Sequence, residues 1–165
     1  MKIIKELKLA DLITIGNFCA GILSVFFSIK QELNIAASLM ILAFVLDFLD
    51  GRVARYMKSD NKFGKELDSL GDLVSFGVAP AVFGYSTGLS EPIHMIILIF
   101  FAVCGMIRLA RFNVLKIKGF IGVPITTNGI IFPLIYFIVP FSEYVILIYL
   151  IMSVLMISDI KIKKI

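Results

Sequence analysis

Long uncharged stretches divide the chain into six segments, which are separated by charged residues or by short polar turns. In chain order these stretches are 12–29, 33–46, 73–90, 92–107, 119–142 and 144–158. A helix needs roughly 20 residues, and at least about 17, to cross the hydrocarbon core of a bilayer. Several stretches reach this length only when the helix continues through the charged residues at one end. We therefore predict six membrane-spanning helices, three of which bring charged residues to the same side of the membrane.

The composition supports an integral membrane protein. Of 165 residues, 59% are hydrophobic and only 17% are charged, and the mean hydropathy is +1.00. A soluble domain is about half apolar and about a quarter charged, so this chain has more apolar surface than a core of its size can bury. This excludes a disordered chain, a nucleic-acid-binding domain and an ordinary soluble enzyme. We predict one all-α integral membrane domain that spans residues 1–165.

The distribution of basic residues predicts the orientation. Fifteen of the 16 Lys and Arg residues fall on one side of the predicted spans, and only Lys30 falls on the other. Basic residues are enriched in cytoplasmic loops. We therefore expect a multi-pass protein of the cell membrane with both termini in the cytoplasm. Residues 1–9 carry Lys2, Lys5 and Lys8 at helical spacing, which predicts a short amphipathic helix on the inner leaflet.

Four aspartates lie at the cytoplasmic ends of the second and third predicted spans. Asp47 and Asp50 are three residues apart and Asp68 and Asp72 are four apart, so each pair shares one helix face. Ionisable residues within a span are costly and indicate a functional site. Because the two helices are antiparallel, we expect Asp50 to lie near Asp68 and Asp47 near Asp72.

Four clustered carboxylates favour metal binding. Two divalent cations would balance their charge, and hard oxygen ligands suit Mg²⁺, Mn²⁺ or Ca²⁺, of which we predict Mg²⁺ or Mn²⁺. A two-metal site is suited to displacement at phosphorus, and basic residues that suit phosphate oxygens surround this one. They are Arg52, Arg55, Lys58, Lys62 and Lys65. The alternative is structural, in which the aspartates pair with Arg52, Arg55, Arg108 and Arg111.

The same residues form a recognisable motif. It reads Asp47-x-x-Asp50-Gly51-x-x-Ala54-Arg55, then eight residues, then Gly64-x-x-x-Asp68-x-x-x-Asp72. This string resembles the signature of the CDP-alcohol phosphotransferases, membrane enzymes that transfer a phospho-group from a CDP-linked donor to an alcohol and release CMP. The resemblance implies a six-helix fold, a homodimer, four aspartate metal ligands, and Asp72 as the general base. It also implies that Gly51, Ala54 and Arg55 line the cytidine diphosphate site.

Further segments are similar to phosphatidylserine synthases of the CDP-diacylglycerol type. They are residues 63–72, 74–81, 108–113 and 120–124, together with Thr14 and Asn17 in a Thr-x-x-Asn pattern. Glycines 51 and 64 allow close approach of a phosphate, and Lys65 adds a positive charge. The candidate residues for the CDP-lipid are thus Thr14, Asn17, Gly51, Ala54, Arg55, Gly64 and Lys65.

The predicted acceptor site lies at the cytoplasmic end of the fourth span. Arg108 and Arg111 are three residues apart, and an arginine is the usual partner of a carboxylate such as that of L-serine. Asn113 is a third candidate. The alternative is that these arginines contact lipid phosphates. We expect transfer of a phosphatidyl or archaetidyl group from the CDP-activated lipid to the L-serine hydroxyl.

Three other functions compete with this one. Glycerol 3-phosphate or an inositol phosphate could be the acceptor, although either would require more cationic donors than serine. A divalent-cation transporter would need polar residues that continue toward the outer face, where 33–46 and 73–82 are largely apolar. A non-catalytic assembly subunit would leave the four carboxylates unexplained.

Overall fold

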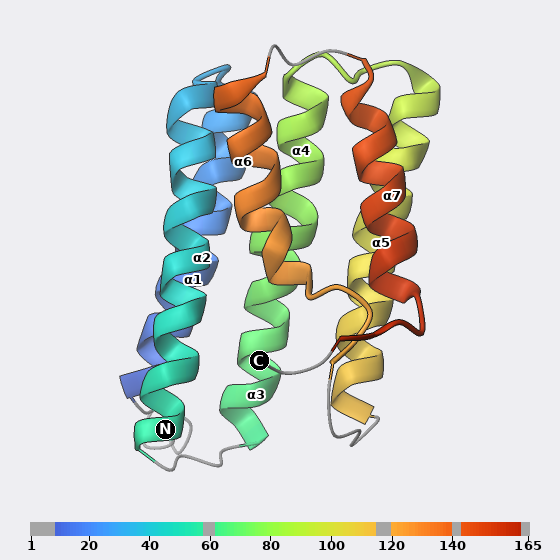
Figure 1. Ribbon diagram of the computed structural model, residues 1–165. Coiled ribbons are helices and arrows are strands. Elements are labelled where there is room, and N and C mark those ends of the chain that lie inside the picture. Colours follow the sequence, from blue (N-terminus) through green and yellow to red (C-terminus); the bar gives the residue numbers. More distant parts are fainter. Residues whose placement is uncertain (1–8, 58–61, 115–119, 140–142, 163–165) are drawn as a thin grey trace.

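The protein is a helical bundle, which a computed structural model describes for residues 9–57, 62–114, 120–139 and 143–162 (Figure 1). Its α-helices are α1 (Leu9–Ile29), α2 (Leu33–Tyr56), α3 (Lys62–Asp72), α4 (Ala79–Ser86), α5 (Pro92–Val114), α6 (Asn128–Ile138) and α7 (Val145–Ile157). A π-helical segment, η2 (Leu73–Val78), joins α3 to α4. The predicted helix at residues 1–9 lies outside the described residues except for Leu9, which begins α1.

The bundle is arranged around the rod formed by α3, η2 and α4. Helix α1 packs along α2 and along this rod, and α5 contacts the rod and α7. Helix α6 packs against α2. In Figure 1, α6 and α7 occupy only the upper part of the bundle, well above the lower ends of α2, α3 and α5.

Four helices in the described residues are long and apolar enough to cross a membrane. They are Ala10–Ile29, Leu33–Tyr56, Lys62–Ser86 and Pro92–Val114. The prediction that helices continue through their charged ends is confirmed for these spans. Helix α2 passes through Asp47 and Asp50, the rod through Asp68 and Asp72, and α5 through Arg108. The protein is therefore an integral membrane protein.

The fifth predicted span differs from the observed structure. Residues 119–142 were expected to form one long helix, but the described helical part is only Ile125–Ile138. Gly122 has a φ of 72°, and Pro124 is extended with ψ of 137°. A Cβ atom on Gly122 would also overlap the carbonyl oxygen of Met156. The backbone there cannot be helical, because left-handed and extended residues interrupt the helical hydrogen-bond pattern.

A short antiparallel pairing follows from this interruption. Strand β1 (Phe120–Ile121) pairs with β2 (Lys161–Ile162), and the Gly122 amide donates to the Ile160 carbonyl at 2.9 Å. These two strands were not predicted from the hydrophobic pattern. The helices Ile125–Ile138 and Val145–Ile157 have 14 and 13 residues. At about 1.5 Å per residue, they are about 20 Å long, shorter than a hydrocarbon core of about 30 Å.

Aromatic side chains fill the space between α5, α6 and α7. The rings of Phe132 and Tyr149 stack with centroids 3.9 Å apart, and Phe101 meets both edge-on at 5.4 and 5.1 Å. All three side chains are fully buried. This packing fixes the two short helices on the long ones and leaves the aspartate-bearing ends of α2 and α3 beside α1.

Candidate active site

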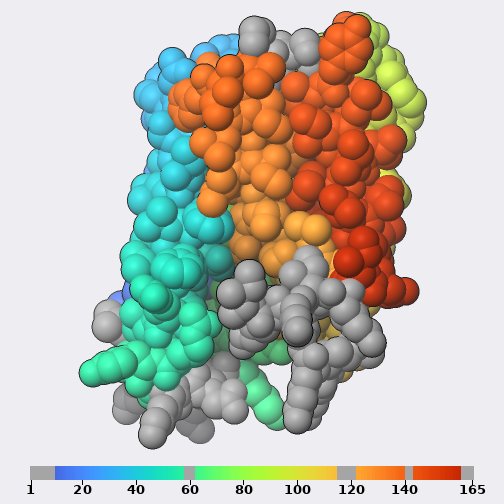
Figure 2. All heavy atoms as spheres, viewed as in Figure 1, coloured from blue at the N-terminus to red at the C-terminus, as the bar shows by residue number. Residues whose placement is uncertain are grey.

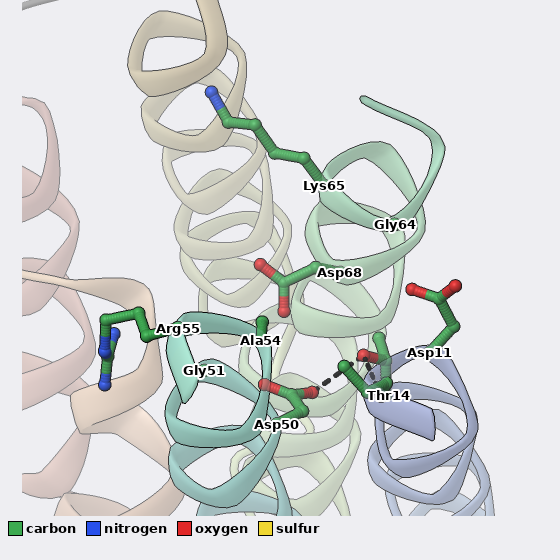
Figure 3. Close-up of a pocket in the computed structure, with 10 residues that line it drawn as sticks. Asp11, Thr14, Asp50, Gly51, Ala54, Arg55, Gly64, Lys65 and Asp68 are labelled. Carbon is green, nitrogen blue, oxygen red and sulfur yellow. Dashed lines mark hydrogen bonds between the residues drawn. The ribbon is translucent and has the colours of Figure 1, made fainter. Parts of the chain in front are cut away.

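The aspartates of α2 and α3 converge at one end of the bundle. Carboxylate oxygens of Asp47, Asp50 and Asp68 all lie within 4.8 Å of one another. Figure 3 shows Asp50 and Asp68 facing each other from their two helices. The carboxyl groups of Asp47 and Asp72 lie beside each other and interact electrostatically. The pairing expected from helix spacing, Asp50 with Asp68 and Asp47 with Asp72, therefore agrees with the structure.

This set of side chains fits divalent cations. Asp50 and Asp72 are buried, with exposed fractions of 5% and 6%, so their charges are poorly screened by water. Two carboxyl groups that lie this close repel each other when both are ionised, unless a proton or a cation lies between them. The facing donors are carboxylate oxygens, which suit Mg²⁺ or Mn²⁺ better than softer metals.

Helix α1 contributes two side chains that orient these carboxylates. The Thr14 hydroxyl donates to Asp50 Oδ2 at 2.8 Å, and the Asn17 amide donates to Asp72 Oδ1 at 3.3 Å. Both side chains are buried. The sequence predicted them as ligands of the CDP-lipid. The structure places them against the aspartates, and Thr14 also lines the adjacent cavity.

A cavity of about 410 Å³ opens beside Asp50 and Asp68. Figure 3 shows its lining residues on α1, α2 and α3. Its wall includes six of the seven candidates for CDP-lipid binding, namely Thr14, Gly51, Ala54, Arg55, Gly64 and Lys65. The seventh, Asn17, does not line it. The guanidinium of Arg55 lies next to Gly51, where a Cβ atom would be 3.6 Å from Nη1.

Arg108 lies on the other side of the aspartates, on α5. It is buried, with 7% of its surface exposed, and its charge interacts with those of Asp72 and Asp47. Its guanidinium packs 5.4 Å from the centre of the Phe112 ring. Among the described residues, its Nε atom has no hydrogen-bond partner. A buried cation with an unused donor is suited to bind an anionic group that enters from outside.

The other two predicted acceptor residues have protein partners other than the aspartates. Arg111 forms an ion pair with Asp159 at 3.1 Å and donates to the carbonyls of Ile157 and Ser158 at 3.2 and 2.9 Å. It therefore binds the C-terminal end of α7. The Asn113 amide donates to the Ser69 hydroxyl at 2.9 Å. The three acceptor candidates do not form a common site.

The sequence profile of the CDP-alcohol phosphatidyltransferase family matches residues 7–159. The chain belongs to this family. The resemblance of the aspartate motif to this family is thereby confirmed, and the enzyme class with it.

Relatives named for serine transfer cover most of the chain, two of them nearly all of it. The CDP-diacylglycerol–serine O-phosphatidyltransferase of Methanocaldococcus jannaschii is 39% identical over 162 residues, which cover 97% of this chain and 76% of the relative. The archaetidylserine synthase of Methanothermobacter thermautotrophicus is 41% identical over 166 residues, which cover 97% of this chain and 71% of the relative. A CDP-diacylglycerol–serine O-phosphatidyltransferase of Bacillus subtilis is 39% identical over 122 residues, which cover 72% of this chain and 69% of the relative.

Two residues that line the cavity were not predicted as site residues. Ala10 and Asp11 lie on the first turn of α1 and complete the wall beside Thr14. Asp11 is three residues before Thr14, so the two share a helix face. That spacing is visible in the sequence and could have identified Asp11. Ala10 carries no polar group, and only the folded structure reveals its position.

Proposed function

We propose that this protein transfers the phosphatidyl or archaetidyl group of a CDP-activated lipid to the hydroxyl of L-serine and releases CMP. The observation that carries this proposal is the near full-length similarity to two relatives named for serine transfer. The apolar bundle agrees with a substrate whose tails lie in the bilayer. The lipid and the serine would meet at the aspartate end of the bundle.

The donor half of the site is assigned to the cavity between α1, α2 and α3. Asp47, Asp50, Asp68 and Asp72 would hold two divalent cations, Mg²⁺ or Mn²⁺. When bound, these ions supply Lewis-acid stabilisation of charge on the phosphate oxygens. Gly51, Ala54 and Gly64 leave room for the cytidine diphosphate in the cavity. Arg55 and Lys65 offer cationic donors to its phosphates.

The acceptor half is assigned to the α5 side of the aspartates. Arg108 would bind the serine carboxylate, since it is buried there and its Nε atom lacks a partner among the described residues. Asp72 would accept the proton of the serine hydroxyl as the oxygen attacks the lipid-side phosphorus. Arg111 and Asn113, also predicted as serine ligands, would act only indirectly, because the guanidinium of Arg111 and the amide N–H of Asn113 already donate to protein partners.

The membrane arrangement is part of the proposal. Arg52, Arg55, Lys62 and Lys65 lie around the connection between α2 and α3, whereas Lys30 lies at the opposite end of α1. This asymmetry supports an active site and both termini on the cytoplasmic side of the cell membrane. We propose that the chain forms one domain, that α6 and α7 are the fifth and sixth spans although each is shorter than the hydrocarbon core, and that the protein is a homodimer, as the family resemblance implies.

An acceptor assay tests the function. Purified protein is incubated with CDP-diacylglycerol or CDP-archaeol, Mn²⁺, and either radiolabelled L-serine or radiolabelled glycerol 3-phosphate. We expect label from serine alone to enter the lipid phase, with stoichiometric release of CMP and no turnover in EDTA. Lipid label only from glycerol 3-phosphate would reject serine as acceptor. Full activity after chelation would reject the metal site.

A further inference from the structure

The π-helical segment η2 begins directly after Asp72. Its wider turn is defined by the Ala79 amide, which donates to the Val74 carbonyl five residues earlier. Each residue of an α-helix turns the chain by about 100°, so a wider turn changes the face that α3 presents relative to α4. Ala79 and Phe83 of α4 are fully buried against α2. The conformation of η2 therefore determines where Asp72 points.

Helix α1 holds the near side of η2. The Ser75 hydroxyl donates to the Asn17 carbonyl at 3.0 Å, while the Asn17 side chain donates to Asp72. A Cβ atom on Gly21 would overlap Ser75, so the glycine allows this close approach of the two helices. Helix α5 also packs against η2.

Helix α6 contacts η2 itself, and α7 contacts the first turn of α4, which follows η2 directly. Pro80 has no N–H to donate to the Phe76 carbonyl four residues earlier. The Asn128 amide of α6 donates to that carbonyl at 3.1 Å. The Tyr149 hydroxyl of α7 donates to the Pro80 carbonyl at 2.7 Å. Asn128 and Tyr149 are both fully buried.

The neighbouring glycines fit this arrangement. A Cβ atom on Gly129, next to Asn128, would lie 2.6 Å from the Phe76 ring. A Cβ atom on Gly84 would lie 2.7 Å from the Tyr149 hydroxyl oxygen. Both helices thus approach the rod closely where their side chains reach the proline-interrupted backbone. Among the described residues, the hydrogen bonds of the two side chains go to Phe76, Met156 and Pro80, and none goes to an aspartate.

We propose that Asn128 and Tyr149 are positioning residues, which hold η2 and the first turn of α4 so that Asp72 faces Asp47 and Arg108. This inference rests on the proposed function, because it assigns a structural cause to the geometry of the proposed metal site. It gives the two short helices a role in the chemistry although they contribute no aspartate. Their effect on the site is transmitted through the backbone of η2.

The test measures Mn²⁺ affinity of the full-length protein in nanodiscs by electron paramagnetic resonance, beside serine kinetics and thermal unfolding. In Asn128→Leu, which retains volume but lacks the donor, we expect Mn²⁺ affinity and kcat to fall about 3- to 10-fold, the range of one lost hydrogen bond. The serine KM should stay within about twofold, since Arg108 is untouched. Tyr149→Phe should lower Mn²⁺ affinity about two- to threefold.

The matched control is Ser24→Ala. Ser24 is fully buried and donates to the Ala36 carbonyl of α2, so this variant also loses one interhelical hydrogen bond to a backbone carbonyl. It should lose stability and retain wild-type Mn²⁺ affinity. Unchanged Mn²⁺ affinity in folded Asn128→Leu, or an equal loss in Ser24→Ala, overturns the inference.

Two further outcomes are decisive. If Asn128→Leu does not fold, Tyr149→Phe decides, and wild-type Mn²⁺ affinity in that variant overturns the inference. If the wild type binds Mn²⁺ but labels no lipid from serine, the proposed function fails. In that case the Mn²⁺ affinities of the variants alone decide whether the inference is correct.

Discussion

The two sides of the aspartate cluster differ in how their residues are assembled. On the α1 side, six predicted residues line a single cavity beside Asp50 and Asp68. On the α5 side, Arg108 reaches the aspartates, while Arg111 and Asn113 bind Asp159 and Ser69. The predicted donor residues therefore form one site, whereas the predicted acceptor residues have different partners and do not.

The difference has a physical origin in the lengths of chain involved. The donor side depends mainly on α2 and α3, which are consecutive antiparallel helices, so helical spacing fixes which side chains face each other. The acceptor side depends on what packs against α5. Arg111 of α5 binds residues at the end of α7, which lie 46–48 residues later in the chain. A local motif carries no information on that contact.

The largest expected effect is at Asp72, where the two sides meet. Asp72→Asn retains the shape of the side chain but removes the proton acceptor. A positioned general base contributes about 10²- to 10⁴-fold to rate, so we expect kcat to fall by that factor. CDP-lipid affinity should fall much less, because proton transfer occurs only in the transition state. Steady-state kinetics and equilibrium binding of the CDP-lipid provide the measurement. A comparable loss in both quantities would mean that Asp72 acts only as a ligand.

Arg108 and Arg111 provide the next test, since they lie three residues apart on one helix with different partners. A hydrogen bond to a charged group is worth about 1.5–3 kcal/mol, so Arg108→Gln should raise the serine KM roughly 10- to 150-fold. Arg111→Gln should change this KM less than about threefold, because its guanidinium binds the end of α7. Serine saturation curves for both variants measure the contrast. The reverse order would restore Arg111 as the serine ligand.

Much of the donor site could be predicted from the sequence because charge and periodicity determine it. The cost of charge in a membrane span identified Asp47, Asp50, Asp68 and Asp72 as a functional group. Helical spacing gave the pairing that the structure contains. The role of Thr14 and Asn17 as hydrogen-bond donors to these aspartates was not predicted. It depends on the rotation of α1 against α2 and α3, which no spacing rule specifies.

The fold was predicted least well where backbone conformation departs from the hydrophobic pattern. Residues 119–142 are uncharged, so they resemble a span, yet Gly122 and Pro124 interrupt the helix. The π-helical turn at Leu73–Val78 lies in an equally uncharged segment. Hydropathy responds to burial in lipid or protein and is insensitive to a single positive φ or an added residue in a turn.

The hydroxyl of Thr14 gives a smaller effect on the donor side. Thr14→Val retains the shape and removes the donor to Asp50 Oδ2. We expect Mn²⁺ affinity to fall about 2- to 5-fold, the lower part of the range for a hydrogen bond. The Thr14 hydroxyl also lies 3.2 Å from the Ala10 carbonyl, so its single proton is divided between two acceptors. Mn²⁺ titration measures this change, and Thr14→Ser is the control that retains the donor. Equal loss in Thr14→Ser would assign the effect to the methyl group.

The smallest effect is expected at the end of α7, where the acceptor side is tied to the C-terminal segment. Asp159 pairs with Arg111, but 93% of its side chain is exposed, and exposed ion pairs contribute about 0–1 kcal/mol. Asp159→Asn should therefore lower the free energy of unfolding by less than about 0.5 kcal/mol and leave the serine kinetics unchanged. Arg111→Met should cost more, about 1–2 kcal/mol, because the carbonyls of Ile157 and Ser158 also lose their donor. Reversible unfolding of both variants in the same detergent gives the two values. Helix α7 lies on the face of the bundle that Figure 2 shows. Equal destabilisation of the two variants would show that the ion pair, rather than the carbonyl contacts, stabilises the end of α7.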